Sequence, residues 1–239
     1  MKISLIHPSR GRPQKSLETC KRWVDRSGYK DIQIVISIDR DDSARIQYIE
    51  NARDLELYVL NNELKFPLAE YDGSSTRPIA AFSISHSNKS VVEATNRAVR
   101  QAHGDIFIYL SDDFDCPENW GPLIIKEFEG VTTPQLIKVD DCLQPFRTPV
   151  LTIPIMNRQL YERLGYFWHP SYKSMFVDED LFWTTRKLKA LKYCQHLKFE
   201  HKHVSVGKAQ DDETYRRSAA NWTQGEQVFL DRKQAGFPV

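Results

Sequence analysis

The amino-acid sequence predicts an α/β fold in which a mostly parallel sheet is flanked by helices. Two observations carry this prediction. Apolar runs alternate with helical patterns along the first half of the chain, and the run Ile32–Ile38 is β-branched and almost continuously apolar. Strands that are covered on both faces have that composition, and strand–helix alternation favours parallel pairing with right-handed crossovers. The second half is less regular, so we expect a less orderly C-terminal part.

The elements of the first half follow from apolar patterning. We predict strands at Lys2–His7, Ile32–Ile38, Leu55–Leu60 and Asp105–Leu110, and helices at 14–27, 43–51 and 91–102. The helix at 91–102 has the clearest pattern, because its Val and Ala residues recur at helical spacing. The segment 61–87 is rich in Pro and Ser and receives no element. Connections of that length are functional or mobile in most proteins.

The second half is predicted more coarsely. We expect helices at 118–129, 157–164 and 179–191, strands at 135–139, 150–155 and 197–204, and two polar helices at the C-terminal end.

Composition excludes several classes of protein. The 33 Lys and Arg residues balance 32 Asp and Glu residues, which argues against a dedicated nucleic-acid coat but leaves a local basic face open. No run approaches 18 apolar residues, so no membrane span is expected, and the N-terminal stretch does not resemble a secretory signal. The four cysteines lack CxxC spacing, which argues against a disulfide frame or zinc knuckle and predicts a cytoplasmic protein.

Charged side chains follow three predicted strands at the point where each strand ends. They are Arg10 and Arg12 after the first strand, Asp39, Asp41 and Asp42 after the second, and Asp112, Asp113 and Asp115 after the fourth. Ligands of open parallel sheets bind beyond the carboxyl ends of the strands. The coincidence of three charged strand ends therefore predicts a binding site at this edge of the sheet.

Each group at that edge has a functional and a structural interpretation. Carboxylates such as Asp112 and Asp113 suit a hard divalent cation shared with substrate phosphates, but a solvated acidic turn that caps the next helix has the same sequence. The guanidinium groups of Arg10 and Arg12 suit a phosphate or a planar base, although a lone Arg-Gly-Arg is more often surface.

Three further groups lie beyond residue 165. Asp178-Glu179-Asp180 opens a helix, either as acids favoured by the helix dipole or as a source of a general base. His201 and His203 share one face of a short strand and are either metal ligands or half-exposed histidines. The basic stretch 186–208 is either a solvated face or a contact for an anionic acceptor. The aromatic run Tyr166–His169 serves in packing or in stacking on a sugar or base.

Taken in order, these residues resemble family-2-like glycosyltransferases with the GT-A fold. The stretch Asn88–Trp120 is similar to a family segment in which small residues and an Asn precede Ala-x-Gly-Asp, an apolar strand, a paired Asp and Pro-x-x-Trp. Glu179-Asp180 with Arg186 resembles an acceptor-side Glu-Asp followed by Arg. The resemblance covers about residues 2–205 and is best over Asn88–Trp120. The Gly-rich approach to the acceptor side that the family shows is weak here.

The resemblance implies a GT-A-type, Rossmann-like sheet in one continuous domain, with a donor-binding half at 1–140 and an acceptor-side half at 141–239. The donor-binding residues that it implies are Pro8, Ser9, Arg10, Arg12, Asp39, Lys89, Asn96 and Asp112. The metal ligands that it implies are Asp113, or Asp115 in a second register of Asp-x-Asp, with His201 or His203. For catalysis it implies Asp180 as the base, with Glu179 as its competitor.

The function implied is transfer of a sugar from a nucleotide-diphosphate donor, a UDP-sugar first, to an acceptor hydroxyl, with Mn²⁺ or Mg²⁺ as cofactor and inversion at the anomeric carbon. The acceptor stays open, and a hydroxymethylated base of viral DNA is one alternative. A sugar nucleotidyltransferase is a second alternative, although the loop after the first strand has one glycine instead of a Gly-rich run. A non-catalytic sugar- or nucleotide-binding module is a third.

Overall fold

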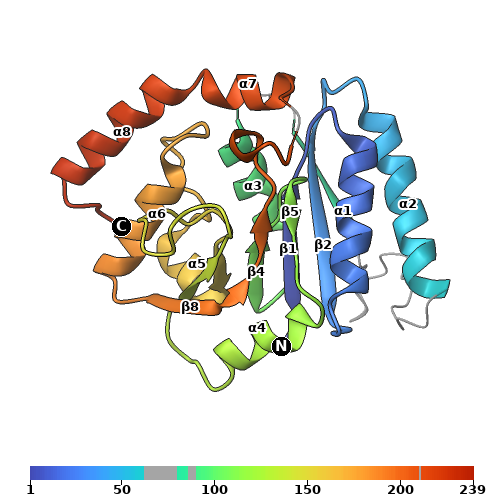
Figure 1. Cartoon of the computed structure of the whole chain (residues 1–239), viewed down its shortest axis with the longest axis horizontal. Coiled ribbons are helices and arrows are strands. Elements are labelled where there is room, and N and C mark those ends of the chain that lie inside the picture. The colour runs from blue at the N-terminus through green and yellow to red at the C-terminus, as the bar shows by residue number, and fades with distance from the viewer. Residues whose placement is uncertain (62–79, 86–89, 210) are drawn as a thin grey trace.

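The computed structural model describes residues 1–61, 80–85, 90–209 and 211–239 (Figure 1). Its central sheet contains, in spatial order, β3 (Ala80–Ser85), β2 (Ile32–Asp39), β1 (Ile3–Pro8), β4 (Ile106–Tyr109), β7 (Ile155–Asn157), β6 (Leu136–Asp140) and β8 (Leu191–Lys198). Among these strands β7 alone runs antiparallel to its neighbours. The mostly parallel α/β sheet predicted from the sequence is confirmed.

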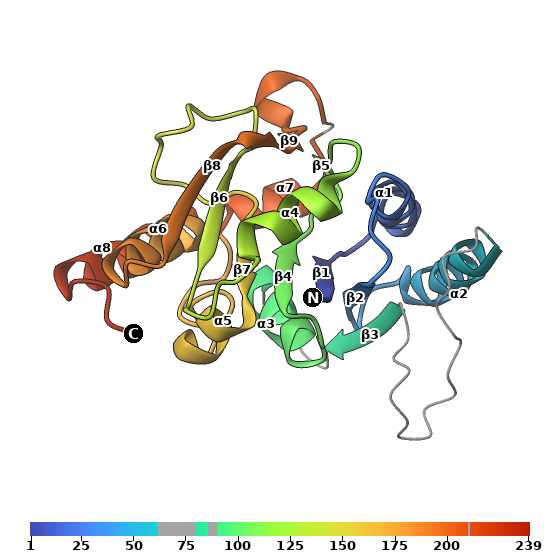
Figure 2. The ribbon, with the colours of Figure 1, turned by 90° about the horizontal axis from the view of Figure 1, so that it is seen from below.

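Helices cover both faces of the sheet (Figure 2). One face packs against α1 (Pro13–Asp25), α2 (Arg45–Asn61) and α4 (Trp120–Phe128). The other face packs against α3 (Val91–Arg100), α5 (Arg158–Leu164), α6 (Val177–Lys187) and α8 (Trp222–Gln234). Since strands β1, β2 and β4 are buried on both sides, their apolar content is near-continuous, as in parallel sheets in general.

Local sequence explains where the two helices nearest the strand ends begin. Pro13 stands in the first turn of α1, where its missing N–H costs no helical hydrogen bond. Ser90 caps α3, because its hydroxyl accepts a hydrogen bond from the backbone N–H of Glu93 at 3.1 Å. Both helices therefore start at the carboxyl-end edge of the sheet.

Two short strands and one short helix complete that edge. The strand β5 (Phe114–Asp115), directly after β4, pairs antiparallel with β9 (Glu200–His201). A 3-10 turn (Val204–Val206) follows, and then α7 (Glu213–Ala219) lies above the upper ends of the central strands (Figure 1). The β5–β9 pair brings the C-terminal part of the chain back to the acidic loop after β4.

The sequence-based boundaries fail at three strands. Leu55–Leu60, predicted as a strand, lies inside α2, because a short apolar run does not distinguish a strand from a helix. The third parallel strand is β3, within the segment for which no element was predicted. Residues 150–154 are irregular before the short β7, and the strand predicted at 197–204 begins earlier, as β8.

Close backbone contact joins α8 to the loop before α6. A Cβ at Gly225 would lie 2.4 Å from the carbonyl oxygen of Met175, so only glycine fits there. The next residue, Phe176, has a left-handed backbone (φ 68°) and serves as the N-cap residue of α6. None of the described helices is long and apolar enough to cross a membrane.

Candidate functional site

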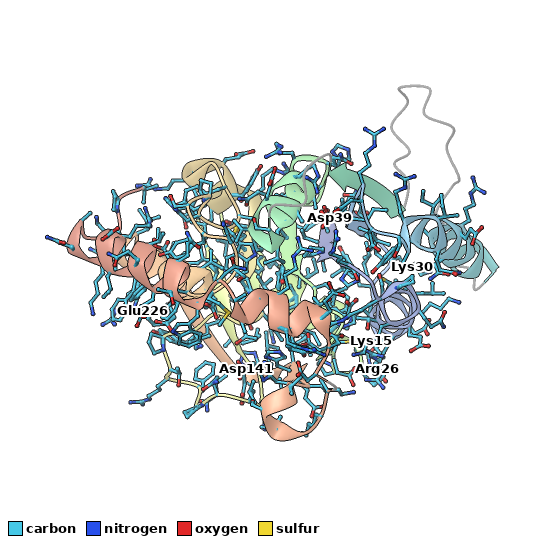
Figure 3. The ribbon with its side chains drawn as sticks, turned by 90° about the horizontal axis from the view of Figure 1, so that it is seen from above. Lys15, Arg26, Lys30, Asp39, Asp141 and Glu226 are labelled. Carbon is cyan, nitrogen blue, oxygen red and sulfur yellow. The ribbon has the colours of Figure 1, made fainter. Side chains whose placement is uncertain are left out.

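A cavity of about 590 Å³ lies beyond the carboxyl ends of β1, β2 and β4, beneath α7. Figure 3 views this edge from above and labels Asp39 at the end of β2. Among the predicted residues, the lining includes Pro8, Ser9, Arg10, Arg12, Asp39, Asp112, Asp113, His201 and His203. The structure therefore brings together the charged strand ends and the two histidines, which are almost ninety residues further along the chain.

Asp112 is held by residues of β1 and the loop that follows it. The buried His7 places Nε2 3.1 Å from Asp112 Oδ1, and the Ser9 hydroxyl donates to Asp112 Oδ2 at 3.0 Å. Burial alone would lower the pKa of His7, but the hydrogen bond and charge of Asp112 raise the pKa above the usual value for imidazole. Asp112 is thus oriented by a buried imidazole and a hydroxyl group.

The two arginines of the β1 loop make different ion pairs. Arg10 Nη1 lies 2.9 Å from both Asp39 Oδ2 and Asp41 Oδ1, so it links the ends of β1 and β2. Arg12 binds Asp212 through two hydrogen bonds of 2.7 and 2.5 Å, and its guanidinium lies 5.0 Å from the centre of the Tyr215 ring. Both cations therefore reach the cavity already paired with carboxylates.

Asp113 and His201 form a buried pair across the β5–β9 ladder, with His201 Nε2 3.3 Å from Asp113 Oδ2. The hydroxyl of Tyr215 also donates to Asp113 Oδ2. Burial would raise the pKa of Asp113, but the hydrogen bond and charge of His201 hold it well below its usual range. Asp113 is therefore a carboxylate at neutral pH.

Two atoms of this pair are buried and have no hydrogen-bond partner, Asp113 Oδ1 and His201 Nδ1. Buried polar atoms without a protein partner are rare, and in a cavity lining they are available to bind a ligand. Carboxylate oxygen and imidazole nitrogen both suit Mn²⁺, and carboxylate oxygen suits Mg²⁺. The described residues contain no group of three or more His, Cys, Asp or Glu that could hold a metal ion. A divalent cation here would need further oxygen atoms from a bound ligand.

The remaining metal candidates differ in how they face the cavity. His203 lines it, with its ring 4.9 Å from that of His201, and Nδ1 lies 2.8 Å from the Ser205 hydroxyl. Burial, and then the neighbouring His201, lower the pKa of His203, which favours a neutral imidazole. Asp115 is outside the lining and is bound by three cations, Arg22, Arg26 and Lys202, at 2.9, 3.0 and 2.6 Å.

Asp180 does not have the surroundings of a general base. Its side chain is 1% exposed and lies outside the cavity lining. Arg232 of α8 binds Asp180 Oδ2 through Nε at 2.5 Å, and Tyr172 and Thr184 donate hydroxyl hydrogen bonds to the same carboxylate. Both of its oxygens are bound by protein groups, so this position gives no support to the base role predicted for Asp180, which stays a prediction. Its predicted competitor, Glu179, is partly exposed but also lies outside the lining.

Asp178, which the sequence analysis did not select as the base, lines the cavity instead. Burial raises the pKa of its carboxyl above the usual value, as suits a group that accepts a proton. Helical spacing alone could not have found it. Thr185 and Phe182, which flank Asp178 around α6, are buried as Asp180 is, so the sequence pattern does not separate the two carboxylates.

Asn96 is used by the protein itself. Its side-chain oxygen accepts hydrogen bonds from the backbone N–H groups of Phe167 and Trp168, each at 2.9 Å, and its amide donates to the Trp168 carbonyl at 2.7 Å. Trp168 lines the cavity. Asn96 therefore holds the aromatic run Tyr166–His169 beside the cavity. Its own side chain lies outside the cavity lining, so the structure does not show the donor contact predicted for it. Lys89 lies outside the described residues.

The basic stretch 186–208 does not form one face of free cations. Lys192, Lys202 and Lys208 each pair with an acid, at 2.9, 2.6 and 2.6 Å. Lys187 donates to the backbone carbonyl of Gly236 at 2.6 Å. The four cysteines are unpaired, as expected from their spacing.

No family model and no curated protein matches the chain. Solved structures do match it in fold. The mannosyltransferase PcManGT from Pyrobaculum calidifontis, in complex with GDP-Man and Mn²⁺, superposes with a TM-score of 0.62 at 13% identity over 83% of this chain and 56% of that one. S. aureus TarS 1–349 superposes in complex with UDP-GlcNAc with a TM-score of 0.59 at 13% identity, over 84% of this chain and 58% of that one. The chain has a GT-A-type glycosyltransferase fold.

The likeness is one of architecture. TarS 1–349 in complex with UDP superposes over 97% of this chain at 12% identity, with a TM-score of 0.62. The chain spans 56% of PcManGT. It spans 60% of TarS 1–349 without a named ligand and 71% of TarS 1–349 with UDP. Each neighbour therefore has substantial structure without a counterpart here. The GT-A fold implied by the sequence resemblance is confirmed.

Proposed function

We propose that the protein is a metal-dependent glycosyltransferase that moves a sugar from a nucleotide-diphosphate donor to an acceptor hydroxyl. One observation carries the proposal. Asp113 Oδ1 and His201 Nδ1 are buried without partners in a cavity that Asp178 also lines. A cation near the phosphates and a base near the acceptor hydroxyl both assist transfer of a sugar from a diphosphate leaving group.

The donor half of the cavity supplies groups for each part of a nucleotide sugar. Asp39, with the Arg10 that binds it, faces the nucleobase in this proposal, and Asp112, fixed by His7 and Ser9, faces the ribose or sugar. Arg12 binds the diphosphate, for which a guanidinium fork is suited. The structural neighbours were solved with GDP-Man, UDP and UDP-GlcNAc, which supports a donor of this class.

Asp113 and His201 would hold Mn²⁺ or Mg²⁺ together with the donor phosphates. When bound, the cation neutralises the charge that develops on the leaving diphosphate without a proton transfer. His203 lies beside His201 and is the alternative imidazole ligand for the cation in this proposal. The cation bound with GDP-Man in PcManGT supports this part of the proposal.

Asp178 replaces Asp180 as the proposed general base. Its carboxylate takes the proton from the acceptor hydroxyl while that oxygen forms a bond to the anomeric carbon, and the bond from that carbon to the diphosphate oxygen breaks. Attack from the side opposite the leaving group inverts the anomeric centre. Asp180 orients α6 from within the core, two residues away.

Asp178→Asn tests the base. Removing a general base lowers kcat by about 10²- to 10⁴-fold, while donor binding stays within about twofold because the metal and arginine groups are unchanged. Turnover is measured as nucleoside diphosphate released in the presence of Mn²⁺ and a mixed acceptor panel. Glu179→Gln is the matched control, since it removes the same charge from the neighbouring position outside the cavity.

Two results would contradict the proposal. Near-normal turnover by Asp178→Asn removes the base assignment. Release of pyrophosphate in place of nucleoside diphosphate would identify the protein as a sugar nucleotidyltransferase, the alternative class named above. Chelation by EDTA, followed by addition of Mn²⁺, tests the metal: we expect turnover to vanish and return.

A further inference from the structure

The lid of the cavity comes from the C-terminal segment of the chain. α7 lies across the edge at which β1 and β4 end (Figures 1 and 3). Its N-cap residue, Asp212, binds the guanidinium of Arg12, and the hydroxyl of Tyr215 binds the carboxylate of Asp113. One short helix thus binds the cation proposed for the donor diphosphate and one oxygen, Oδ2, of the carboxylate whose other oxygen is proposed for the metal.

The chemistry of these contacts matches that of a donor. A carboxylate offers a guanidinium two oxygen atoms in the same planar arrangement as two phosphate oxygens. The Arg12 side chain is 10% exposed and that of Asp212 is 38% exposed, so Arg12 presents its guanidinium from the cavity wall and Asp212 meets it from the solvent side. Tyr215 covers the same guanidinium with its ring, 5.0 Å away. A diphosphate would have to displace Asp212 to pair with Nε and Nη2 of Arg12.

Polar contacts hold α7 in position at both of its ends. The Thr214 hydroxyl donates to the Arg10 carbonyl at 3.3 Å, and Ser174 donates to the Ser218 carbonyl at 3.0 Å, on the opposite side of the cavity. No residue of α7 is buried. Segments with little buried apolar surface open at low free-energy cost. The helix can therefore leave without disturbing the core.

We infer that α7 is an internal competitor of the donor: Asp212 occupies the diphosphate position on Arg12, Tyr215 ties α7 to Oδ2 of Asp113 beside the proposed metal ligand Oδ1, and the nucleotide binds only after α7 has moved. The inference rests on the proposed function, because it takes Arg12 and Asp113 as the donor-binding groups. The apparent affinity for nucleotide is then the intrinsic affinity multiplied by the fraction of molecules in which α7 is open. Weakening the two contacts raises that fraction.

Two substitutions release the contacts separately. Asp212→Asn removes the charge that binds Arg12 and keeps an N-cap residue, so α7 can still begin there. Tyr215→Phe removes the hydroxyl on Asp113 and keeps the ring over Arg12. Glu213→Gln is the matched control: it removes one negative charge from the same helix at an exposed position outside the cavity lining.

Titration calorimetry with UDP and with GDP, each in Mn²⁺, measures the competition. We expect each single variant to bind the better nucleotide about fivefold more tightly, and the double variant about tenfold or more, as for a coupling of ordinary size. The control should bind as the wild type does. Equal or weaker binding by Asp212→Asn and Tyr215→Phe overturns the inference and leaves the proposed function standing.

Hydrogen exchange gives a second readout that needs no turnover. The amides of residues 213–219 should exchange faster in the double variant without nucleotide, and in the wild type when nucleotide and Mn²⁺ are added. Slower exchange of these amides on nucleotide addition overturns the inference, since α7 would then close over the ligand. Failure of both the wild type and the double variant to bind either nucleotide overturns the proposed function and the inference together.

Discussion

The cluster around Asp113 and the cluster around Asp180 use the same ingredients in opposite ways. Each has a buried carboxylate, a nitrogen-bearing partner and a tyrosine hydroxyl. Both oxygens of Asp180 are bound, by Arg232 and by hydroxyl groups. One oxygen of Asp113 has no partner. The oxygen without a partner, rather than burial or charge, is therefore what makes Asp113 the proposed ligand and leaves Asp180 a structural ion pair in that proposal.

The largest expected effect lies on the Asp113 side. Asp113→Asn preserves the shape of the residue and removes the charge that a cation requires. We expect kcat to fall by about a thousandfold, equivalent to about 4 kcal/mol, while the melting temperature moves by less than about 4 °C. Nucleoside diphosphate release and thermal melting measure the two. If the variant is much less stable but each folded molecule retains wild-type turnover, Asp113 serves stability, as Asp180 does, and the contrast between the two clusters is lost.

On the Asp180 side the effect should fall on stability. Asp180→Asn leaves the buried Arg232 without its countercharge, so the free energy of unfolding drops by about 3 kcal/mol. Adding Arg232→Met removes the unpaired cation and should recover most of that loss. Urea unfolding of the two single variants and the double variant forms the cycle. Additive losses would mean that the ion pair is not what holds α6 to α8.

Asn96 provides a smaller test of the structural class. Asn96→Ala leaves the backbone groups of Phe167 and Trp168 without partners, and we expect a loss of about 2 kcal/mol in unfolding free energy. Asn96→Asp retains the acceptor for both N–H groups and should lose less. If both variants keep full stability but lose nucleotide binding, the donor contact first predicted for Asn96 is restored.

The smallest effect is a shift in pH dependence at Asp178. Its folded-state pKa is raised, so the carboxylate form of the proposed base is lost as pH falls through a value above 3.8. Turnover should be constant above that pKa and fall about tenfold per pH unit below it. The positive charge of Lys138 lowers this pKa, so Lys138→Met should move the falling limb to higher pH. An unmoved limb would assign the titration to another group.

The strand-end half of the site could be predicted because its signals are local. An apolar run that stops at Pro8, or at Ser111-Asp112-Asp113, places a charge at a sheet edge without knowledge of the rest of the chain. The approach of His201 was implied only by the resemblance. It depends on the β5–β9 pairing, whose two strands are too short to produce a recognisable pattern.

The residues proposed for the acceptor side could not be predicted from local sequence signals. The choice between Asp178 and Asp180 depends on Arg232, 52 residues beyond Asp180, and a single sequence carries no sign of that contact. The contacts of Arg12 with Asp212 and of Asp113 with Tyr215 span 200 and 102 residues. The division at residue 140 and a modified-DNA acceptor stay predictions, and the pairing of Lys192, Lys202 and Lys208 with acids gives the latter no added support.

Gly225 limits which substitutions α8 can accept. Because a Cβ at this position would lie 2.4 Å from the carbonyl oxygen of Met175, α8 and the loop before Asp178 are in direct backbone contact. If Asp178 is the base, changes in α8 are a route to its position that leaves the cavity lining unaltered. Variant libraries aimed at the acceptor should therefore include α8 and keep Gly225.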